Sequence, residues 1–224
     1  MNGVIGDLLP LAVGVAVSPL PIVAVILMLL APRAGGTSAG FLLGWVLGVA
    51  VATTLFTVLA AMGVLGSNDS GPSTAASWVK IVIGVLLLGL AARQWEGRPR
   101  PGEDVVMPKW MAAIGSFTFA RASGLGFLLA AVTPKNLLMC VAAGVTVGGS
   151  SISVGQQVAG VAVFTVLAVS TVAVPVIGYA VAKDRMRSPL DELNTWLQAN
   201  NATVMAVLLL VIGAALVGKG LGGL

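Results

Sequence analysis

Two short proline motifs, each inside a long apolar stretch, are the residues of this chain best placed to do chemistry. The first reads Ser18-Pro19-Leu20-Pro21 and the second reads Thr133-Pro134-Lys135-Asn136. A proline has no backbone N–H and clashes with the preceding helical turn, so each motif should break a helix and leave carbonyl groups without partners. Inside a membrane such carbonyls persist only where protein or a water-filled cavity covers them. The motifs therefore predict either structural kinks or the lining of a polar path.

Lys135 is the sharper candidate, because it lies near the middle of its apolar stretch. A lysine at that depth costs at least about 2.5–3.5 kcal/mol on insertion scales, so it should face a polar cavity or a partner. None of the eight acidic residues falls in the middle of an apolar stretch, and Asp7 lies near the outer end of the first one. We expect Lys135 either to bond to carbonyls freed by Pro19 and Pro21 or to meet an anionic group of a substrate. The predicted substrate path comprises Ser18, Pro19, Pro21, Thr133, Pro134, Lys135 and Asn136.

The elements that carry these motifs are transmembrane helices. The 224 residues are 58% hydrophobic and only 9% charged, with a mean hydropathy of +1.03, which leaves too few ionised groups to cover a water-facing surface. Apolar stretches of about 20 residues, each long enough to cross the bilayer, recur along the chain. The sequence predicts an all-α membrane protein with six spans, at residues 4–31, 37–66, 74–94, 122–148, 152–182 and 199–219.

Basic residues are distributed unevenly among the connections between these spans. The second and fourth connections, at 66–73 and 149–151, hold none, whereas the first, third and fifth hold Arg33, Arg93, Arg98, Arg100, Lys109, Arg121, Lys183, Arg185 and Arg187. The positive-inside rule then predicts a multi-pass protein of the cytoplasmic membrane with both termini outside, which Lys219 opposes weakly. Orientation explains the net charge of +4, so we predict no nucleic-acid partner.

The composition also bounds the chemistry. The chain has no histidine and a single cysteine, Cys140, which lies in an apolar span and is read as a small buried hydrophobic residue. Without histidine or acids at membrane depth, a general base is lacking, and we predict no metal, no cofactor and no enzymatic activity.

The two halves repeat. The motif at Ser18 recurs at Thr133, 115 positions later, and the same offset pairs Ser38 with Ser153 and Gly40 with Gly155. Three spans per copy is an odd number, so the second copy should enter the membrane from the opposite side, with the first and fourth helices broken at matching positions. The predicted organisation is a first repeat (1–95), a basic cytoplasmic connection with an interfacial segment (96–121) and a second repeat (122–224).

Other segments predict packing. Gly40, Gly44 and Gly48 share one helix face, which favours close helix contact within the subunit or across a dimer. Ser188 and Pro189 have the pattern of a helix start, followed by an interfacial helix with Trp196 at headgroup level. Hydroxyl groups inside spans are expected mainly to bond back to their own helix, with the path as the alternative for Thr53, Thr54, Thr57, Thr165, Ser170 and Thr171.

At its paired proline motifs the chain resembles the lysine exporter superfamily, with Thr133 where an Asn-Pro-Lys-like motif has asparagine and Leu20 departing from a Pro-Gly-Pro-like run. Within it the chain is most similar to the GAP family, the sulfolipid- or glycopeptidolipid-addressing proteins of actinobacteria. The cues are the basic third connection, the Pro-Lys-Trp run at 108–110, the Thr-Pro-Lys-Asn-Leu motif and the segment around Trp196. The resemblance implies a six-helix inverted-repeat transporter, often a homodimer, that helps to export an envelope glycolipid.

Three functions remain open from the sequence. The first is export of a lipid or glycolipid across the membrane, which the lack of intramembrane carboxylates favours over export of a basic amino acid. The second is an accessory role as a scaffold for a larger lipid-export machine, with the basic connection and the interfacial helices as its docking surface. The third is export of a small amino-acid-like solute.

Overall fold

The computed structural model describes residues 2–31, 34–63, 74–97 and 114–224, and this part of the chain is helical without strands. The predicted Pro-Lys-Trp run and most of the connection at 96–121, like most of the connection at 66–73, lie outside the described residues. The elements are α1 (Asn2–Ala16), α2 (Pro19–Leu30), α3 (Ala34–Ala61), α4 (Thr74–Glu96), the short 3-10 helix η1 (Ile114–Ser116), α6 (Phe119–Ala131), α7 (Pro134–Gly148) and α8 (Val154–Leu221).

Four helical segments are each long and apolar enough to cross a membrane: Ala34–Ala61, Ser77–Glu96, Val154–Ala182 and Ala202–Leu221. Two further candidates are bent pairs, because α1 with α2 and α6 with α7 pass the same test together while turning by 51° and 64° at their breaks. The described chain therefore holds four to six candidate spans. They coincide with the six predicted stretches, and the bent pairs confirm the helix breaks predicted at the two proline motifs.

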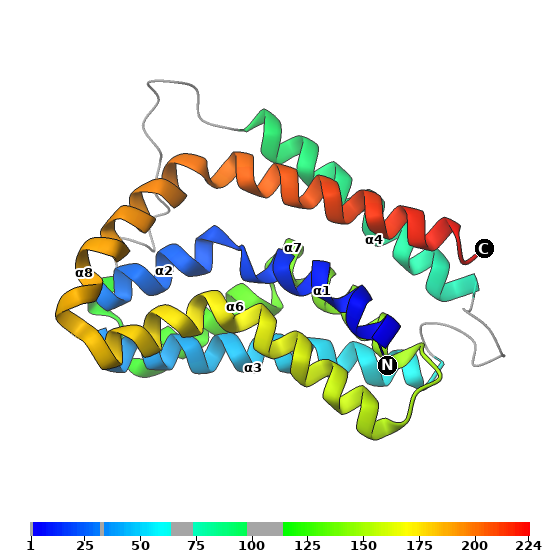
Figure 1. Cartoon of the computed structure of the whole chain (residues 1–224), viewed down its shortest axis with the longest axis horizontal. Helices are drawn as coiled ribbons and strands as arrows, with labels where there is room; N and C mark the ends of the chain where they lie inside the picture. Colours follow the sequence, from blue (N-terminus) through cyan, green and yellow to red (C-terminus); the bar gives the residue numbers. More distant parts are fainter. Residues whose placement is uncertain (1, 32–33, 64–73, 98–113) are drawn as a thin grey trace.

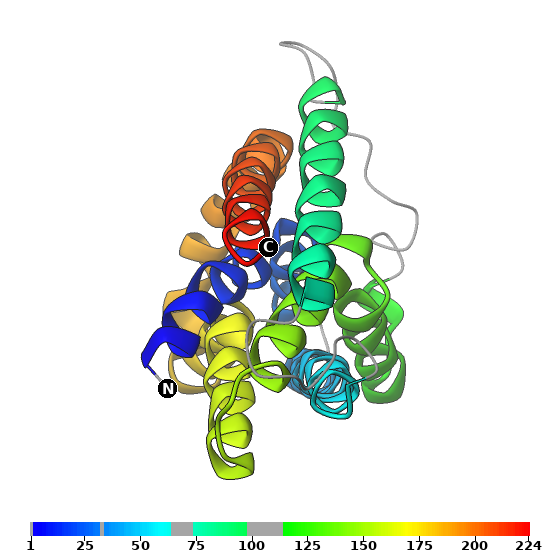
Figure 2. The ribbon, with the colours of Figure 1, turned by 90° about the vertical axis from the view of Figure 1, so that its right-hand side faces the viewer.

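Both termini lie at one end of the molecule, together with the turn between α7 and α8 (Figure 1). The opposite end holds the end of α2, the start of α3 and the bend of α8 (Figure 1). We call these the terminal end and the bend end. The last part of α8 runs beside α4 as a separate pair on one side of the remaining helices (Figure 2).

Glycines set the distance between α3 and α6. A Cβ atom added to Gly44 would lie 1.9 Å from the carbonyl oxygen of Ser123, and one added to Gly40 would lie 2.6 Å from that of Phe119. From the other side, a Cβ on Gly126 would lie 2.3 Å from the Phe41 carbonyl oxygen. The predicted glycine face of the second span is thus a packing surface, and its partner is α6 of the same chain rather than a second subunit.

Glycines also bring α4 and α8 into close contact. A Cβ on Gly84 would lie 2.8 Å from the carbonyl oxygen of Gly213, and a Cβ on Gly213 would lie 3.0 Å from that of Gly84. Each glycine thus admits the backbone of the other helix, which gives dispersion contacts that lipid cannot replace. The two helices therefore form one closely packed unit.

The expected helix start at Ser188 is wrong. α8 runs through this region, and its one non-helical residue is Ala182 (φ −140°, ψ 50°), six residues earlier. Ser188 and Pro189 are exposed, and the Ser188 hydroxyl donates to Glu192 at 3.3 Å. A proline there removes a single N–H donor, and at an exposed position water can serve the carbonyl that loses it. The helix therefore continues past Pro189.

The segment around Trp196 has a buried and an exposed side. Leu190 and Leu197 are buried, while Leu193 and Trp196 are exposed. Placement of Trp196 at headgroup level stays a prediction.

The close approach at Gly44 predicts a stability effect. Gly44→Ala should destabilise the protein by about 1–3 kcal/mol or more, because the new methyl group overlaps the backbone of α6. Gly124→Ala on the facing helix is the matched control, since its Cβ would meet nothing within 4 Å. Heating the purified protein in detergent and measuring the monodisperse fraction left by size-exclusion chromatography checks this. Equal midpoints for the two variants would contradict the packing.

Candidate functional site

The first helix break frees the carbonyl of Gly14. In a continuous helix this oxygen would accept the N–H of Ser18, and the oxygen of Val15 would accept that of residue 19. Residue 19 is a proline, and the Ser18 N–H donates instead to Val15 at 3.2 Å. Ser18 itself is extended (φ −79°, ψ 106°), and Pro19 opens α2. The Gly14 carbonyl, on a buried residue, thus loses its helical partner.

Lys135 supplies that partner. Its Nζ donates to the Gly14 carbonyl at 2.8 Å and approaches Sδ of Met205 at 3.5 Å, and the residue is 9% exposed. The prediction that Lys135 bonds to a carbonyl freed by the first motif is confirmed. An ammonium group has three donors and both partners are uncharged, so its charge is not neutralised by them.

The carbonyl freed at the second break also receives a hydrogen bond from a side chain. Nδ2 of Asn136 donates to the carbonyl of Leu129 at 3.0 Å, the oxygen that would accept the N–H of Thr133 in an unbroken helix. Oδ1 of Asn136 accepts a long hydrogen bond from the Ser18 hydroxyl at 3.5 Å. Asn136 therefore joins the two breaks directly, although Ser18 lies 118 positions away in the sequence.

The two freed carbonyls occupy equivalent positions in the sequence pattern. Leu129 follows Gly14 by 115 positions, the offset that relates the two proline motifs. Both carbonyls take their donors from the second motif, through Lys135 and Asn136. The first motif has Leu20 and Pro21 at the matching places, which carry no side-chain donor. This explains why the second motif alone is polar after its proline.

A third side chain reaches the first break from α8. The Thr171 hydroxyl donates to the carbonyl of Ala16, the last residue of α1. Thr171 was expected to bond back to its own helix, and that expectation is wrong because a freed carbonyl on a neighbouring helix is within reach. The predicted back-bonding is found for three hydroxyls, those of Thr57, Thr165 and Ser170.

A cavity of about 390 Å³ adjoins the breaks. Of the predicted path residues, five line it: Ser18, Pro19, Thr133, Pro134 and Lys135. Asn136 is buried beside them with its bonds described above, whereas Pro21 is buried in α2 and is not part of the lining. The structure thus brings the two motifs together; their role in a substrate path stays a prediction.

The opposite wall of this cavity was not foreseen. It comes from Leu90, Arg93 and Gln94 on α4 and from Met205 and Leu209 on α8. Arg93 stood out in the sequence only as a loop charge at a span end, and its direction could have been inferred only from the pairing of α4 with α8. Among the described residues, the lining contains two cations, Lys135 and Arg93, and no carboxylate.

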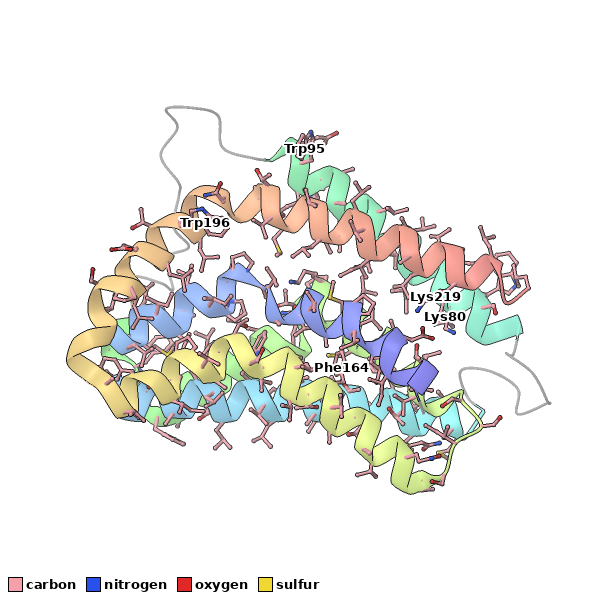
Figure 3. All side chains as sticks on the ribbon, viewed as in Figure 1. Lys80, Trp95, Phe164, Trp196 and Lys219 are labelled. Carbon is pink, nitrogen blue, oxygen red and sulfur yellow. The ribbon has the colours of Figure 1, made fainter. Side chains whose placement is uncertain are left out.

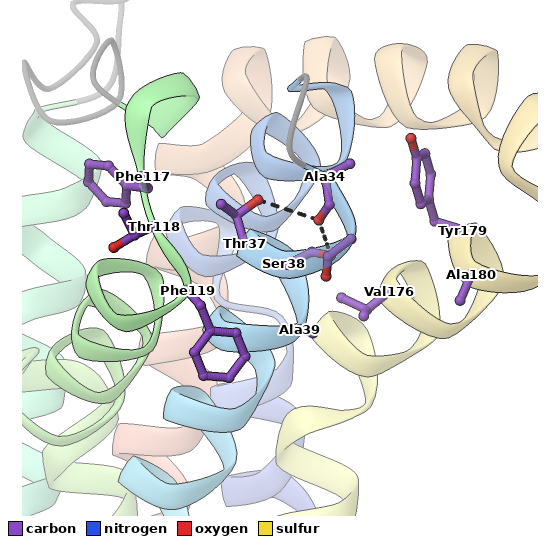
Figure 4. A pocket seen from close by; sticks show the side chains of 12 residues that line it. Ala34, Thr37, Ser38, Ala39, Phe117, Thr118, Phe119, Val176, Tyr179 and Ala180 are labelled. Atoms are coloured by element: carbon purple, nitrogen blue, oxygen red, sulfur yellow. Dashed lines mark hydrogen bonds between the residues drawn. The ribbon is translucent and has the colours of Figure 1, made fainter.

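A larger cavity of about 750 Å³ lies at the bend end, between the start of α3, the segment before α6 and α8 (Figure 4). The hydroxyls of Thr37 and Ser38 both donate to the Ala34 carbonyl, at 3.4 and 2.6 Å (Figure 4). Phe117, Phe119 and Tyr179 give it an aromatic wall. Among the described residues, no group of three His, Cys, Asp or Glu side chains could hold a metal ion.

The fold and the site define a polytopic helical membrane protein in which two proline-broken helices meet at a buried lysine beside a cavity. The family model described as Sap, sulfolipid-1-addressing protein, matches residues 8–222. The chain belongs to this family, which confirms the narrower of the two resemblances drawn from the sequence. No curated protein and no solved structure matches the chain.

The bond from Thr171 to the first break predicts a measurable cost. Thr171→Val keeps the shape of the side chain but leaves the Ala16 carbonyl without this donor, which should destabilise the protein by about 1–3 kcal/mol. Thr165→Val on the same helix removes a hydroxyl that donates only to a carbonyl of its own helix, so it should be close to neutral. Thermal unfolding of both variants in detergent decides the matter, and equal stabilities would show that the Thr171 bond is dispensable.

Proposed function

We propose that this protein translocates an anionic envelope glycolipid of the sulfolipid type across the cytoplasmic membrane, with the cavity beside Lys135 as the headgroup site. The observation that carries the proposal is that Lys135 and Arg93 both line a cavity to which the described residues contribute no carboxylate. Burying a lysine without a counter-charge is costly, and an anionic headgroup would provide that counter-charge. The family name, which refers to addressing a sulfolipid, supports the same class of substrate.

The dimensions of the cavity support a headgroup rather than a whole lipid. Its volume of about 390 Å³ lies at the lower end of the range of about 300–1,000 Å³ for small-molecule sites. The acyl chains would stay in the bilayer, in contact with the apolar outer faces of the helices. Val82, Val85 and Leu86 on α4 are examples of such exposed residues.

The two broken helices support a transporter. In many transporters, inverted repeats with matching helix breaks surround a site at the middle of the membrane. Here the breaks precede Pro19 and Pro134. The carbonyls freed at Gly14 and Leu129 are separated by the same offset as the two copies of the sequence repeat. We infer that residues 1–95 and 122–224 are inverted copies, with the bend end in the cytoplasm and both termini outside. The same argument favours membership of the lysine exporter superfamily.

A second function is favoured by a different observation. Lys135 bonds to the Gly14 carbonyl, so it has a structural task whether or not it meets a substrate. This structural task is equally consistent with the alternative function, an accessory scaffold in a larger lipid-export machine with the connection at 96–121 as its docking surface. Homodimerisation is compatible with either function. A solute exporter for basic amino acids fits less well, because the cavity would repel a cation.

Lys135→Gln separates the two tasks of the lysine. Glutamine still offers an N–H to the Gly14 carbonyl but carries no charge, so the variant should fold and accumulate like the wild type. Export should fall to near the level of a deletion strain, and Lys135→Arg should restore only part of it, because a planar guanidinium does not replace a compact ammonium. The assay is the distribution of labelled glycolipid between inner and outer leaflets, normalised to protein level. Normal export by Lys135→Gln would favour the accessory function.

Arg93 gives an independent test of the cavity. Arg93→Gln should reduce export of an anionic glycolipid several-fold, since it removes the second positive charge from the lining. Arg121→Gln is the matched control, because Arg121 is also an exposed arginine of a membrane helix but is not part of the lining. Export rates from reconstituted vesicles that contain a fluorescent sulfated glycolipid would be compared. A loss of equal size in both variants would point to surface charge and away from this cavity.

A further inference from the structure

A second group of charges lies at the terminal end of the molecule. Asp7 on α1 forms an ion pair with Lys219 near the end of α8, and their side chains are 42% and 41% exposed. Lys80 on α4 lies beside Lys219 (Figure 3), and all three residues border one narrow cavity of about 20 Å³. The group therefore contains two lysines and one carboxylate, so one positive charge lacks a carboxylate within the group.

This group and the cavity beside Lys135 lie on one seam. The α4–α8 pair forms one wall at both places, and the bent first helix with α7 forms the other. Between the two places α1 is packed tightly, because a Cβ on Gly14 would lie 2.5 Å from Cδ1 of Ile212 and 2.7 Å from Cε of Met139. The seam is thus wide beside Lys135 and Arg93 and closed from Gly14 to the terminal end.

The closing ion pair is weak enough for a substrate to displace. A half-exposed pair contributes little to stability, because water screens it and two side chains must be held in place. The anionic group of a sulfated or phosphorylated headgroup has the same chemistry as the Asp7 carboxylate, with an additional acceptor oxygen. It could bind Lys219 in place of Asp7 and also engage Lys80, which lies on the opposite wall of the seam from Asp7.

We propose that Lys80 and Lys219 form a second binding site for the anionic headgroup, at the exit of the seam. Asp7 occupies this site as an internal counter-ion and holds α1 against α8 until the headgroup arrives from Lys135. The proposal rests on the proposed function, because it requires a headgroup that travels along the seam. It extends that function by assigning the exit and the group that closes it.

Cross-linking across the seam tests the closure. Leu11→Cys with Ala215→Cys, in a Cys140→Ser background, would be joined across the same narrow cavity by a short, cleavable bifunctional thiol reagent, which leaves Asp7, Lys80 and Lys219 in place. Export of a fluorescent sulfated glycolipid from phosphatidylcholine vesicles should be abolished by the cross-link and should return to the level of the untreated variant when the link is cleaved. Full export by the cross-linked protein would overturn the proposal.

The control cross-link joins two helices on the same side of the seam. The Ser77 hydroxyl donates to the Gly223 carbonyl at 3.0 Å, and a Cβ on Gly223 would lie 3.6 Å from Cβ of Ser77. That separation suits a disulfide in Ser77→Cys with Gly223→Cys. This bond holds α4 to α8 without touching α1, so export should continue. If both cross-links stop export, general rigidity is responsible and the exit site is refuted.

Thiol labelling tests the opening without relying on transport. A cysteine placed at Ile212, which is 3% exposed, should react slowly with an impermeant reagent applied from the terminal side. Asp7→Asn should raise that rate several-fold, and so should vesicles containing the sulfated glycolipid, whereas an uncharged glycolipid should not. Unchanged rates in both cases would overturn the exit site. Faster labelling without any export by the wild type would instead refute the proposed transport function and leave the ion pair as the closure.

Discussion

The rest of the structure depends on one constraint: a backbone carbonyl freed inside a membrane must find a donor within the protein. Each proline motif frees such carbonyls, and an unsatisfied one costs several kcal/mol in hydrocarbon. The donors come from Lys135, Asn136 and Thr171, none of which lies on the first bent helix. The two breaks are therefore tied to each other and to α8, and the polar core of the protein is a consequence of its prolines.

Close packing by glycine completes the arrangement. Gly44 and Gly126 bring α3 and α6 to backbone contact, and Gly84 and Gly213 do the same for α4 and α8. These contacts produce two compact helix pairs, and the α4–α8 pair faces the bent first helix and α7 across the seam beside Lys135. Gly14 packs closely against Ile212 and Met139 within that seam, and a cavity remains beside Lys135. The seam is thus closed at Gly14, open beside Lys135 and lined by charged residues both there and at the terminal end.

Much of the fold could be predicted because an unsatisfied polar group inside a membrane has a large free-energy cost, which leaves few possible arrangements for the chain. The positions of the spans follow from hydrophobic length. The breaks at Ser18 and Thr133 follow from the proline after each, which lacks a backbone N–H and clashes with the preceding helical turn. The depth of Lys135 predicted a carbonyl partner, which is Gly14. The α8 bend at Ala182 could not be predicted, since alanine carries no local signal for it and Pro189 carries a misleading one.

Contacts between helices that are distant in the sequence could not be predicted from the pattern of residues within each helix. Thr171 reads like any hydroxyl on an apolar helix until α1 is placed beside it, and Arg93 reads like a loop charge until α4 is paired with α8. The ion pair of Asp7 with Lys219 joins the two extremes of the chain, 212 positions apart. Each of these depends on which helices become neighbours, and the spacing of residues along one helix does not contain that information.

The origin of the donors also has a consequence for biogenesis. Lys135 lies 121 positions and Thr171 155 positions downstream of the carbonyls they satisfy, so a ribosome releases the first bent helix long before its partners exist. Until the second half is synthesised, the nascent first half carries exposed polar backbone in the bilayer and should be retained by the insertion machinery or recognised by membrane quality control. A chain interrupted after α4 would then be degraded rather than accumulate as half a protein, and the two halves would have to be inherited as one reading frame or be made together.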